Sequence, residues 1–287
     1  MEKNKSQKIL KNQKGYTDKI PLDYFIESKH KGKITKIKYS SKDYTKNDKP
    51  IIKEAYVYTP YGYDENNKNK KYNIIYLMHG WTMTSEYYIF KCDITTILDN
   101  MIEKRIIEPL ILVSATFDAE NRPQDFSRSD KEIRVFHKDF RENLIYAVET
   151  KFNTYSNRSN NIQDYISSRE YRAFGGFSLG SVTTWHQFIF NHDIIKYYLP
   201  MSGSCWYYGG FSDYYPEKTC DFFEKMIKED NLDEKGYFIY ATTGLYDGIK
   251  HQMDTQMDEM LKRKNIFTKD KVVYYLKKEG YHNLDAV

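Results

Sequence analysis

The sequence predicts an α/β fold with a mostly parallel central sheet, antiparallel strands at its N-terminal edge and helices on both faces. Three observations predict it. Nearly continuous apolar runs, such as residues 72–78 and 110–115, are typical of strands buried on both sides. Segments with helical spacing of apolar residues fall between these runs, and strands that alternate with helices indicate a parallel sheet. Two alternating, β-rich runs near the N-terminus are instead typical of edge strands.

Seven strands are expected in chain order. The first two, residues 32–40 and 51–58, alternate apolar and polar side chains, and the polar residues 41–50 between them are turn material. The charged loop at residues 59–71 then leads into the buried runs. These runs are residues 72–78, 110–115, 171–174, 237–242 and 272–276.

Four helices are expected between the buried strands. Residues 135–152 give the clearest pattern, because Phe136, Phe140, Leu144 and Val148 recur close to every 3.6 residues. The other three segments have shorter apolar stripes of the same kind. They are residues 94–104, 181–190 and 252–262.

The 287 residues are enough for one large core, and neither an internal repeat nor a domain boundary is visible. We expect a flexible, basic lead-in over residues 1–20 and a single domain over residues 21–287. Residues 1–15 lack the apolar core of a secretory signal, so the chain as written would be cytoplasmic or the mature part of a secreted enzyme.

Charge and cysteine content exclude several classes of protein. With 44 Lys and Arg against 40 Asp and Glu, the net charge of +4 is too small and too dispersed to indicate a nucleic-acid partner. No stretch approaches the roughly 18 apolar residues of a membrane span. Cys92, Cys205 and Cys220 form no C-x-x-C pair, so they are expected as thiols, and a Cys205–Cys220 bridge would need an oxidising compartment. No metal or cofactor is expected, and the oligomeric state is left open.

The segment Gly176-Phe177-Ser178-Leu179-Gly180 is a G-x-S-x-G motif between a strand-like and a helix-like run. Such a motif forms a sharp strand-to-helix turn that exposes a strained nucleophilic serine, although the same five-residue pattern also occurs in ordinary turns. If Ser178 is a nucleophile, the backbone N–H of Leu179 is one donor to the oxyanion that develops on the substrate.

A second oxyanion donor is expected after an earlier buried strand. His79-Gly80-Trp81 directly follows residues 72–78, and the glycine lets the N–H of Trp81 or Thr82 face the serine. His79 is expected to shape this loop and not to act as a base.

The acid and the base are expected after the last two strands, in the order serine, acid, histidine. Asp247 is the acid of the loop at residues 244–248, although an aspartate before glycine is also a common turn residue. His282 follows the last strand and is the expected base. Four other histidines lie on helices or elsewhere, where packing or solvated roles fit better: His137, His186, His192 and His251.

Stretches around the serine motif and along the other strand ends share the pattern of a known family. They are residues 55–64, 77–80, 174–185, 198–203, 206–207 and 241–260. Together they resemble the feruloyl esterase domains of carbohydrate esterase family one, over about residues 50–285. The resemblance implies the α/β-hydrolase fold, a catalytic triad of Ser178, Asp247 and His282, and hydrolysis of ferulate or acetate esters on plant xylan.

The chain departs from the family at three places. Trp81-Thr82-Met83 replaces a glycine-rich loop, and Asn283-Leu284 stands where a tryptophan often follows the catalytic histidine. The chain also ends at Val287, where related folds place a further helix, so an exposed apolar patch is expected on one face of the sheet.

The sequence therefore predicts a serine carboxylic ester hydrolase acting on a small or oligosaccharide ester. Trp206, Tyr207, Thr82 and Asn283 are the expected substrate-binding residues. Aromatic side chains in or beside the site loops could stack on a sugar or an aromatic acid, or simply pack: Trp81, Tyr87, Tyr88, Trp206, Tyr207 and Tyr208. An acyltransferase of the same fold and a non-catalytic carbohydrate-binding relative are the alternatives.

Overall fold

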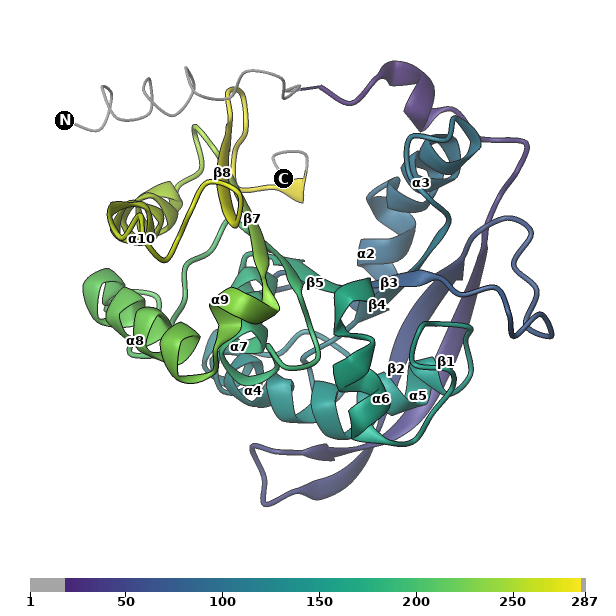
Figure 1. Cartoon of the computed structure of the whole chain (residues 1–287), viewed down its shortest axis with the longest axis horizontal. Helices are drawn as coiled ribbons and strands as arrows, with labels where there is room; N and C mark the ends of the chain where they lie inside the picture. The colour runs from purple at the N-terminus through teal and green to yellow at the C-terminus, as the bar shows by residue number, and fades with distance from the viewer. Residues whose placement is uncertain (1–18, 285–287) are drawn as a thin grey trace.

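The computed structural model describes residues 19–284, so nearly all of the expected lead-in lies outside the described residues. One eight-stranded sheet runs through the molecule in the order β1-β2-β4-β3-β5-β6-β7-β8 (Figure 1). Strands β3 to β8 are parallel, whereas β2 pairs in antiparallel fashion with β1 on one side and with β4 on the other. The predicted α/β class and the antiparallel N-terminal edge are confirmed.

The strands begin and end close to the predicted runs, with one addition. They are β1 (Lys33–Asp43), β2 (Lys49–Thr59), β3 (Asn73–Met78), β4 (Leu110–Ala115), β5 (Arg172–Phe177), β6 (Tyr197–Met201), β7 (Phe238–Gly244) and β8 (Val272–Lys277). The N-terminal hairpin is longer than predicted, because the polar residues 41–43 continue β1 and only residues 44–48 turn. Strand β6 was not predicted.

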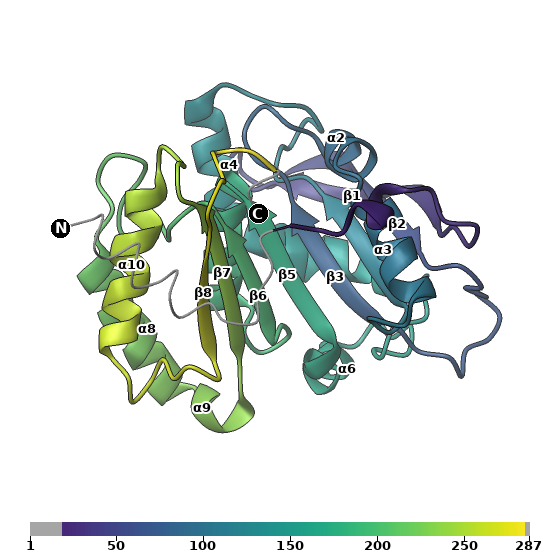
Figure 2. The same ribbon diagram turned by 90° about the horizontal axis from the view of Figure 1, so that it is seen from above.

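Helices cover both faces of the sheet, as Figure 2 shows from above. One face carries the larger core, in which Trp185 and Phe188 of α7 pack with Phe223 of α8 and Met257 of α10. Burial of each such apolar side chain contributes about 1.5–3 kcal/mol. The other face carries a smaller core under α2 and α3, around Tyr58 and Leu112.

The helical segments include all four that the apolar spacing predicts. They are η1 (Leu22–Phe25), α2 (Ser85–Lys91), α3 (Ile94–Glu103), α4 (Phe126–Asp139), η2 (Phe140–Leu144), α5 (Ile145–Glu149), α6 (Ile162–Ser167), η3 (Arg169–Tyr171), α7 (Leu179–Phe190), α8 (Pro216–Glu229), α9 (Leu232–Lys235) and α10 (Lys250–Lys262). None of these helices is long and apolar enough to cross a lipid bilayer.

The helix predicted over residues 135–152 begins nine residues earlier and ends before Phe152. Asp125 starts it, because its side chain accepts a hydrogen bond from the N–H of Arg128 and so caps the first turn. The polar first turns conceal this start from an apolar-spacing argument. A π-helical segment, η2, continues α4 into α5.

A buried ion pair lies at the amino end of β5. Arg172 and Glu149 are 1% and 0% exposed, and the guanidinium makes a two-point contact with the carboxylate at 2.7 and 2.8 Å. Its remaining N–H groups donate to the carbonyls of Tyr165 and Ile194 and to the hydroxyl of Ser168. All five guanidinium donors are therefore used.

An apolar groove of about 800 Å³ lies on the face that carries α2 and α3. From the sheet it is lined by Ile75, Leu77, Leu112, Leu199 and Met201. The sequence predicts an apolar patch on one face of the sheet, and this groove is an apolar surface of that kind. Cys205 and Cys220 are buried thiols and form no disulfide.

Candidate active site

The G-x-S-x-G motif forms the sharp turn between β5 and α7. Ser178 stands alone between the last strand residue, Phe177, and the first helical residue, Leu179. Its backbone angles, φ of 56° and ψ of −114°, lie in a region that residues other than glycine rarely adopt. The neighbouring glycines are required by close approach, since a Cβ on Gly176 would lie 2.5 Å from the Gly180 carbonyl oxygen.

Ser178, His282 and Asp247 form one hydrogen-bonded row. The Ser178 hydroxyl lies 3.0 Å from His282 Nε2, and His282 Nδ1 lies 2.9 Å from Asp247 Oδ2. Because a carboxylate only accepts hydrogen bonds, Nδ1 carries the hydrogen and Nε2 is free to accept the serine proton. The three residues follow β5, β8 and β7, so the parallel sheet brings their loops together at its carboxyl edge.

Asp247 is held as an anion. Its side chain is fully buried, and it also accepts the backbone N–H of Ile249 at 2.8 Å. Burial acts to raise the pKa of this carboxyl, but the hydrogen bonds from His282 and Ile249 outweigh burial and place the pKa below the usual 3.8. Asp247 therefore stays ionised at neutral pH and keeps His282 in the tautomer just described.

The loop after β3 lies against Ser178. A Cβ on Gly80 would lie 3.0 Å from Phe177 Cδ1 and 3.3 Å from Ser178 Cβ, so a larger residue here would crowd both side chains. Thr82, with a φ of 67°, turns the chain back toward α2. The first N–H of a helix has no acceptor within that helix, so the N–H of Leu179 is available at the same place.

His79 shapes this loop from beneath. Its ring is completely buried; Nδ1 donates to the carbonyl oxygen of Gly80 at 2.8 Å, and Nε2 lies 2.8 Å from the Thr116 hydroxyl. Burial lowers the pKa of His79 to about 4, so the ring is neutral at neutral pH. This geometry agrees with a structural histidine and not with a base.

The four competing histidines lie away from Ser178. His186 is buried, with Nδ1 3.3 Å from the Ile133 carbonyl, and His137 stacks on Phe190. His192 lies 3.1 Å from Asp230, and His251 packs edge-on against Tyr214.

Known proteins share this sequence and fold. Endo-1,4-beta-xylanase Y of Acetivibrio thermocellus is 37% identical over 222 residues, 73% of this chain. A mutant feruloyl esterase module from Clostridium thermocellum, solved as a complex with sinapinate, is 31% identical, with a TM-score of 0.78 over 93% of this chain and 88% of that module. The chain belongs to the feruloyl esterase family, carbohydrate esterase family one. It is thus a member of a family of carboxylic ester hydrolases, as the resemblance implied.

The curated relatives of this esterase are much longer proteins. The chain spans 19% of xylanase Y and 17% of an endo-1,4-beta-xylanase/feruloyl esterase of Xylanibacter ruminicola, which is 28% identical over 135 residues, 46% of this chain. No protein-family model matches the chain.

Aromatic rings lie beside the loop that follows β3, residues 79–83. The Trp81 ring is 40% exposed and is fixed in place, because its Nε1–H donates to the Gln124 carbonyl at 2.9 Å and Phe126 packs edge-on against it at 5.3 Å. Sequence reasoning missed Gln124 and Phe126, since the polar run before α4 resembles any loop.

The four expected substrate-binding residues differ in how much of their surface is exposed to solvent. Trp206 is only 2% exposed and packs on Phe126 and Phe211. Its ring therefore supports Phe126, which packs against Trp81, and offers little surface to a substrate. Tyr207 is 37% exposed but stacks on Phe222. Thr82 and Asn283 are exposed beside Trp81 and His282 in the chain.

Within residues 19–284, no cluster of His, Cys, Asp and Glu side chains has the make-up of a metal site. The hydroxyl, imidazole and carboxylate of Ser178, His282 and Asp247 are groups that can perform nucleophilic attack and proton transfer.

Proposed function

We propose that the chain is a serine carboxylic ester hydrolase that acts through an acyl-enzyme on Ser178 and removes feruloyl or acetyl groups from xylan-derived saccharides. The observation that carries the proposal is the hydrogen-bonded row Asp247–His282–Ser178 beside the Gly80 backbone. The names of the relatives, a xylanase/feruloyl esterase and a feruloyl esterase module, support the choice of acyl group and saccharide.

The first half of the reaction forms the acyl-enzyme. Ser178 Oγ attacks the ester carbonyl carbon while His282 Nε2 takes the hydroxyl proton, and Asp247 stabilises the imidazolium. The N–H groups of Leu179 and Trp81 stabilise the negative charge on the carbonyl oxygen. The tetrahedral intermediate then collapses, and His282 returns the proton to the departing sugar oxygen.

The second half releases the acid. Water attacks the acyl carbon, His282 takes its proton, and Ser178 leaves with that proton restored. Exposed Trp81 is the aromatic surface that best suits a feruloyl ring, since its position is fixed before the substrate arrives.

Product analysis tests this function. Hydrolysis of methyl ferulate and p-nitrophenyl acetate should release free ferulic and acetic acid, and feruloylated arabinoxylan oligosaccharides should release ferulic acid. Added acceptor alcohol distinguishes the acyltransferase alternative, because a transferase would divert most of the acyl group to the alcohol. Failure to release acid from any of the three substrates would contradict the proposal.

Replacement of Trp81 by alanine should lower kcat/KM for methyl ferulate by about tenfold, the value of a lost aromatic contact of about 1.4 kcal/mol. The value for p-nitrophenyl acetate should stay within about threefold, because a methyl group makes little use of the ring. The ratio of the two substrates is measured in steady-state kinetics.

Two further variants act as controls for this prediction. Trp81→Phe should restore most of the preference for ferulate. Tyr171 is equally exposed, at 40%, but precedes the amino end of β5. Its replacement by alanine should leave the ratio of the two kcat/KM values unchanged. Equal losses for both esters in Trp81→Ala would count against a ferulate contact.

A further inference from the structure

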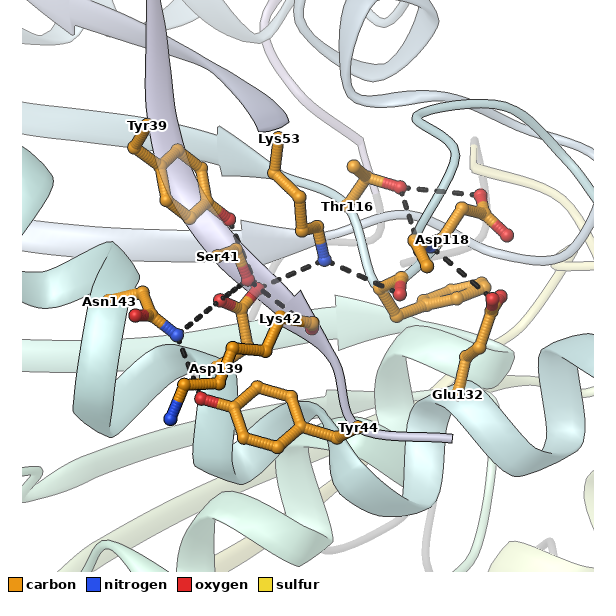
Figure 3. Close-up of polar contacts among 12 residues, drawn as sticks. Tyr39, Ser41, Lys42, Tyr44, Lys53, Thr116, Asp118, Glu132, Asp139 and Asn143 are labelled. Carbon is orange, nitrogen blue, oxygen red and sulfur yellow. Dashed lines mark hydrogen bonds and ion pairs between the residues drawn. The ribbon is translucent and has the colours of Figure 1, made fainter. Parts of the chain in front are cut away.

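A buried polar cluster lies beneath the oxyanion loop and takes no part in the proposed chemistry. Thr116 and Asp118 follow β4, and Glu132 of α4 accepts the backbone N–H of the next residue, Ala119, at 3.3 Å (Figure 3). Thr116 and Asp118 are each 1% exposed and Glu132 is 2% exposed. Through the 2.8 Å contact between Thr116 Oγ1 and His79 Nε2, the cluster touches the histidine that holds Gly80.

The donor and the acceptor can be assigned for each hydrogen bond between His79, Thr116 and Asp118. His79 Nδ1 donates to Gly80, so the neutral ring presents Nε2 as an acceptor, and the hydroxyl hydrogen of Thr116 is the one that reaches it. Thr116 Oγ1 in turn accepts the backbone N–H of Asp118 at 3.1 Å. The remaining contact, 3.3 Å from Thr116 Oγ1 to Asp118 Oδ2, is a hydrogen bond only if the Asp118 carboxyl carries a proton.

The charges around Asp118 favour that proton. Glu132 faces it from α4, and Lys53 faces it from β2, while neutral His79 lies 3.8 Å away. Lys53 is already paired with Asp139 at 3.0 Å. Burial and the charge of Glu132 raise the pKa of Asp118 to about 7, against the opposing effect of Lys53.

The surrounding ion pairs leave no cation to spare for Asp118. Arg128 bonds both Glu132 and Asp43 at 2.6 Å. Among the described residues, Asp118 Oδ1 and Glu132 Oε2 are buried without a hydrogen-bond partner. A second negative charge at Asp118 would therefore be uncompensated, whereas a carboxylic acid would not.

We propose that Asp118 is a positioning residue that, as a carboxylic acid, donates to Thr116 and so commits the Thr116 hydrogen to His79. His79 then keeps its Nδ1 hydrogen on the Gly80 carbonyl. Because the Gly80 carbonyl and the Trp81 N–H belong to one trans peptide, anchoring the carbonyl fixes the direction of the N–H. The inference rests on the proposed function, in which that N–H binds the oxyanion.

Thr116 variants test the link to the loop. In Thr116→Val, kcat for p-nitrophenyl acetate should fall by about tenfold, a fraction of the loss on deleting an oxyanion donor outright, with KM within about twofold. Thr116→Ser should restore kcat. Tyr39→Phe removes a 3.1 Å hydrogen bond to Asp139 in the adjoining part of the cluster and should leave kcat unchanged. Unchanged kcat in Thr116→Val, or an equal fall in Tyr39→Phe, would overturn the proposal.

Asp118→Asn tests the proton. The Asn amide can donate to Thr116 at every pH, so the ratio of its kcat to that of the unmodified enzyme should be near one at about pH 5.5 and rise several-fold by about pH 8.5. Taking the ratio cancels every pH effect that the two proteins share. A ratio that does not change with pH would overturn the proposal, even if the variant folds normally.

Thermal unfolding of the same pair gives a separate readout. A carboxyl whose folded pKa is raised loses its proton more readily in the unfolded chain, so stability falls as pH rises between 3.8 and about 7. The Tm advantage of Asp118→Asn should therefore grow over that range. A growing Tm advantage with a flat kcat ratio would show a structural role only and would refute positioning.

Failure of this inference and failure of the proposed function are distinguishable. If Ser178→Ala remains as active as the unmodified enzyme, the proposed function fails. If Ser178→Ala is inactive while Thr116→Val keeps full kcat, only the role of Asp118 fails.

Discussion

Replacement of Ser178 by alanine should lower kcat for p-nitrophenyl acetate by at least about 10⁴-fold, because the acyl-enzyme can no longer form. The residual rate should be that of water attack assisted by the oxyanion donors alone. KM should change little, since the removed hydroxyl contributes to bond formation more than to substrate binding. Steady-state kinetics on purified protein measure both values.

The matched control for this prediction is Ser129→Ala. Ser129 is fully buried, and its hydroxyl has no hydrogen-bond partner among the described residues, so its removal should leave kcat unchanged. Far-ultraviolet circular dichroism should show both variants folded. A Ser178→Ala protein as active as Ser129→Ala would rule out the triad and favour the non-catalytic or another enzymatic reading.

Replacement of Arg172 by methionine should lower the free energy of unfolding by about 3–5 kcal/mol, the cost of leaving a buried partner charge uncompensated. Glu149 would keep its bonds from the hydroxyls of Tyr76 and Thr154 but would lose its cation. Such a loss is a large part of the stability of a typical domain. Urea unfolding with linear extrapolation gives the change.

Two companion variants separate burial from ion pairing. Arg141 makes a similar two-point contact with Asp193, but both side chains are 34% exposed, so Arg141→Met should cost about 1 kcal/mol or less. The double variant Arg172→Met with Glu149→Gln should be more stable than the sum of its single variants predicts. Equal costs for Arg172→Met and Arg141→Met would mean that burial adds nothing here.

The position of the candidate site could be predicted because each of its parts is marked locally. Ser178 lies in a motif whose glycines are required by close backbone approach, and Asp247 and His282 each follow a buried apolar run. In a parallel sheet the carboxyl ends of strands share one edge, so strand order brings these loops together without any further information. The same reasoning located the loop at His79.

Other elements carry weaker local signals. Strand β6 (Tyr197–Met201) is short and contains Pro200, which cannot donate a backbone hydrogen bond, so it does not resemble a buried strand. Helix α8 (Pro216–Glu229), which was not predicted, does show apolar spacing at Cys220, Phe223 and Ile227 and a proline in its first turn, both typical of a helix.

Long-range packing could not be predicted. The burial of Trp206 depends on Phe126, eighty residues away in the chain, so its aromatic character alone suggested a substrate surface. Thr116 and Asp118 look like ordinary loop residues after a strand. Only the folded arrangement shows that they are buried and that they reach His79.

Lys53 of the N-terminal hairpin has a consequence for how this polypeptide can be divided. Lys53 is 2% exposed, and its ammonium group lies between Asp139 of α4 and the Phe117 carbonyl in the segment after β4. Removal of β1 and β2 would take the cation away from buried Asp139 and the donor away from the Phe117 carbonyl, although Ser178, His282 and Asp247 would all remain. The smallest fragment that keeps this buried ion pair therefore includes the hairpin from Lys33, and a boundary drawn only around the parallel strands would leave Asp139 buried without its cation.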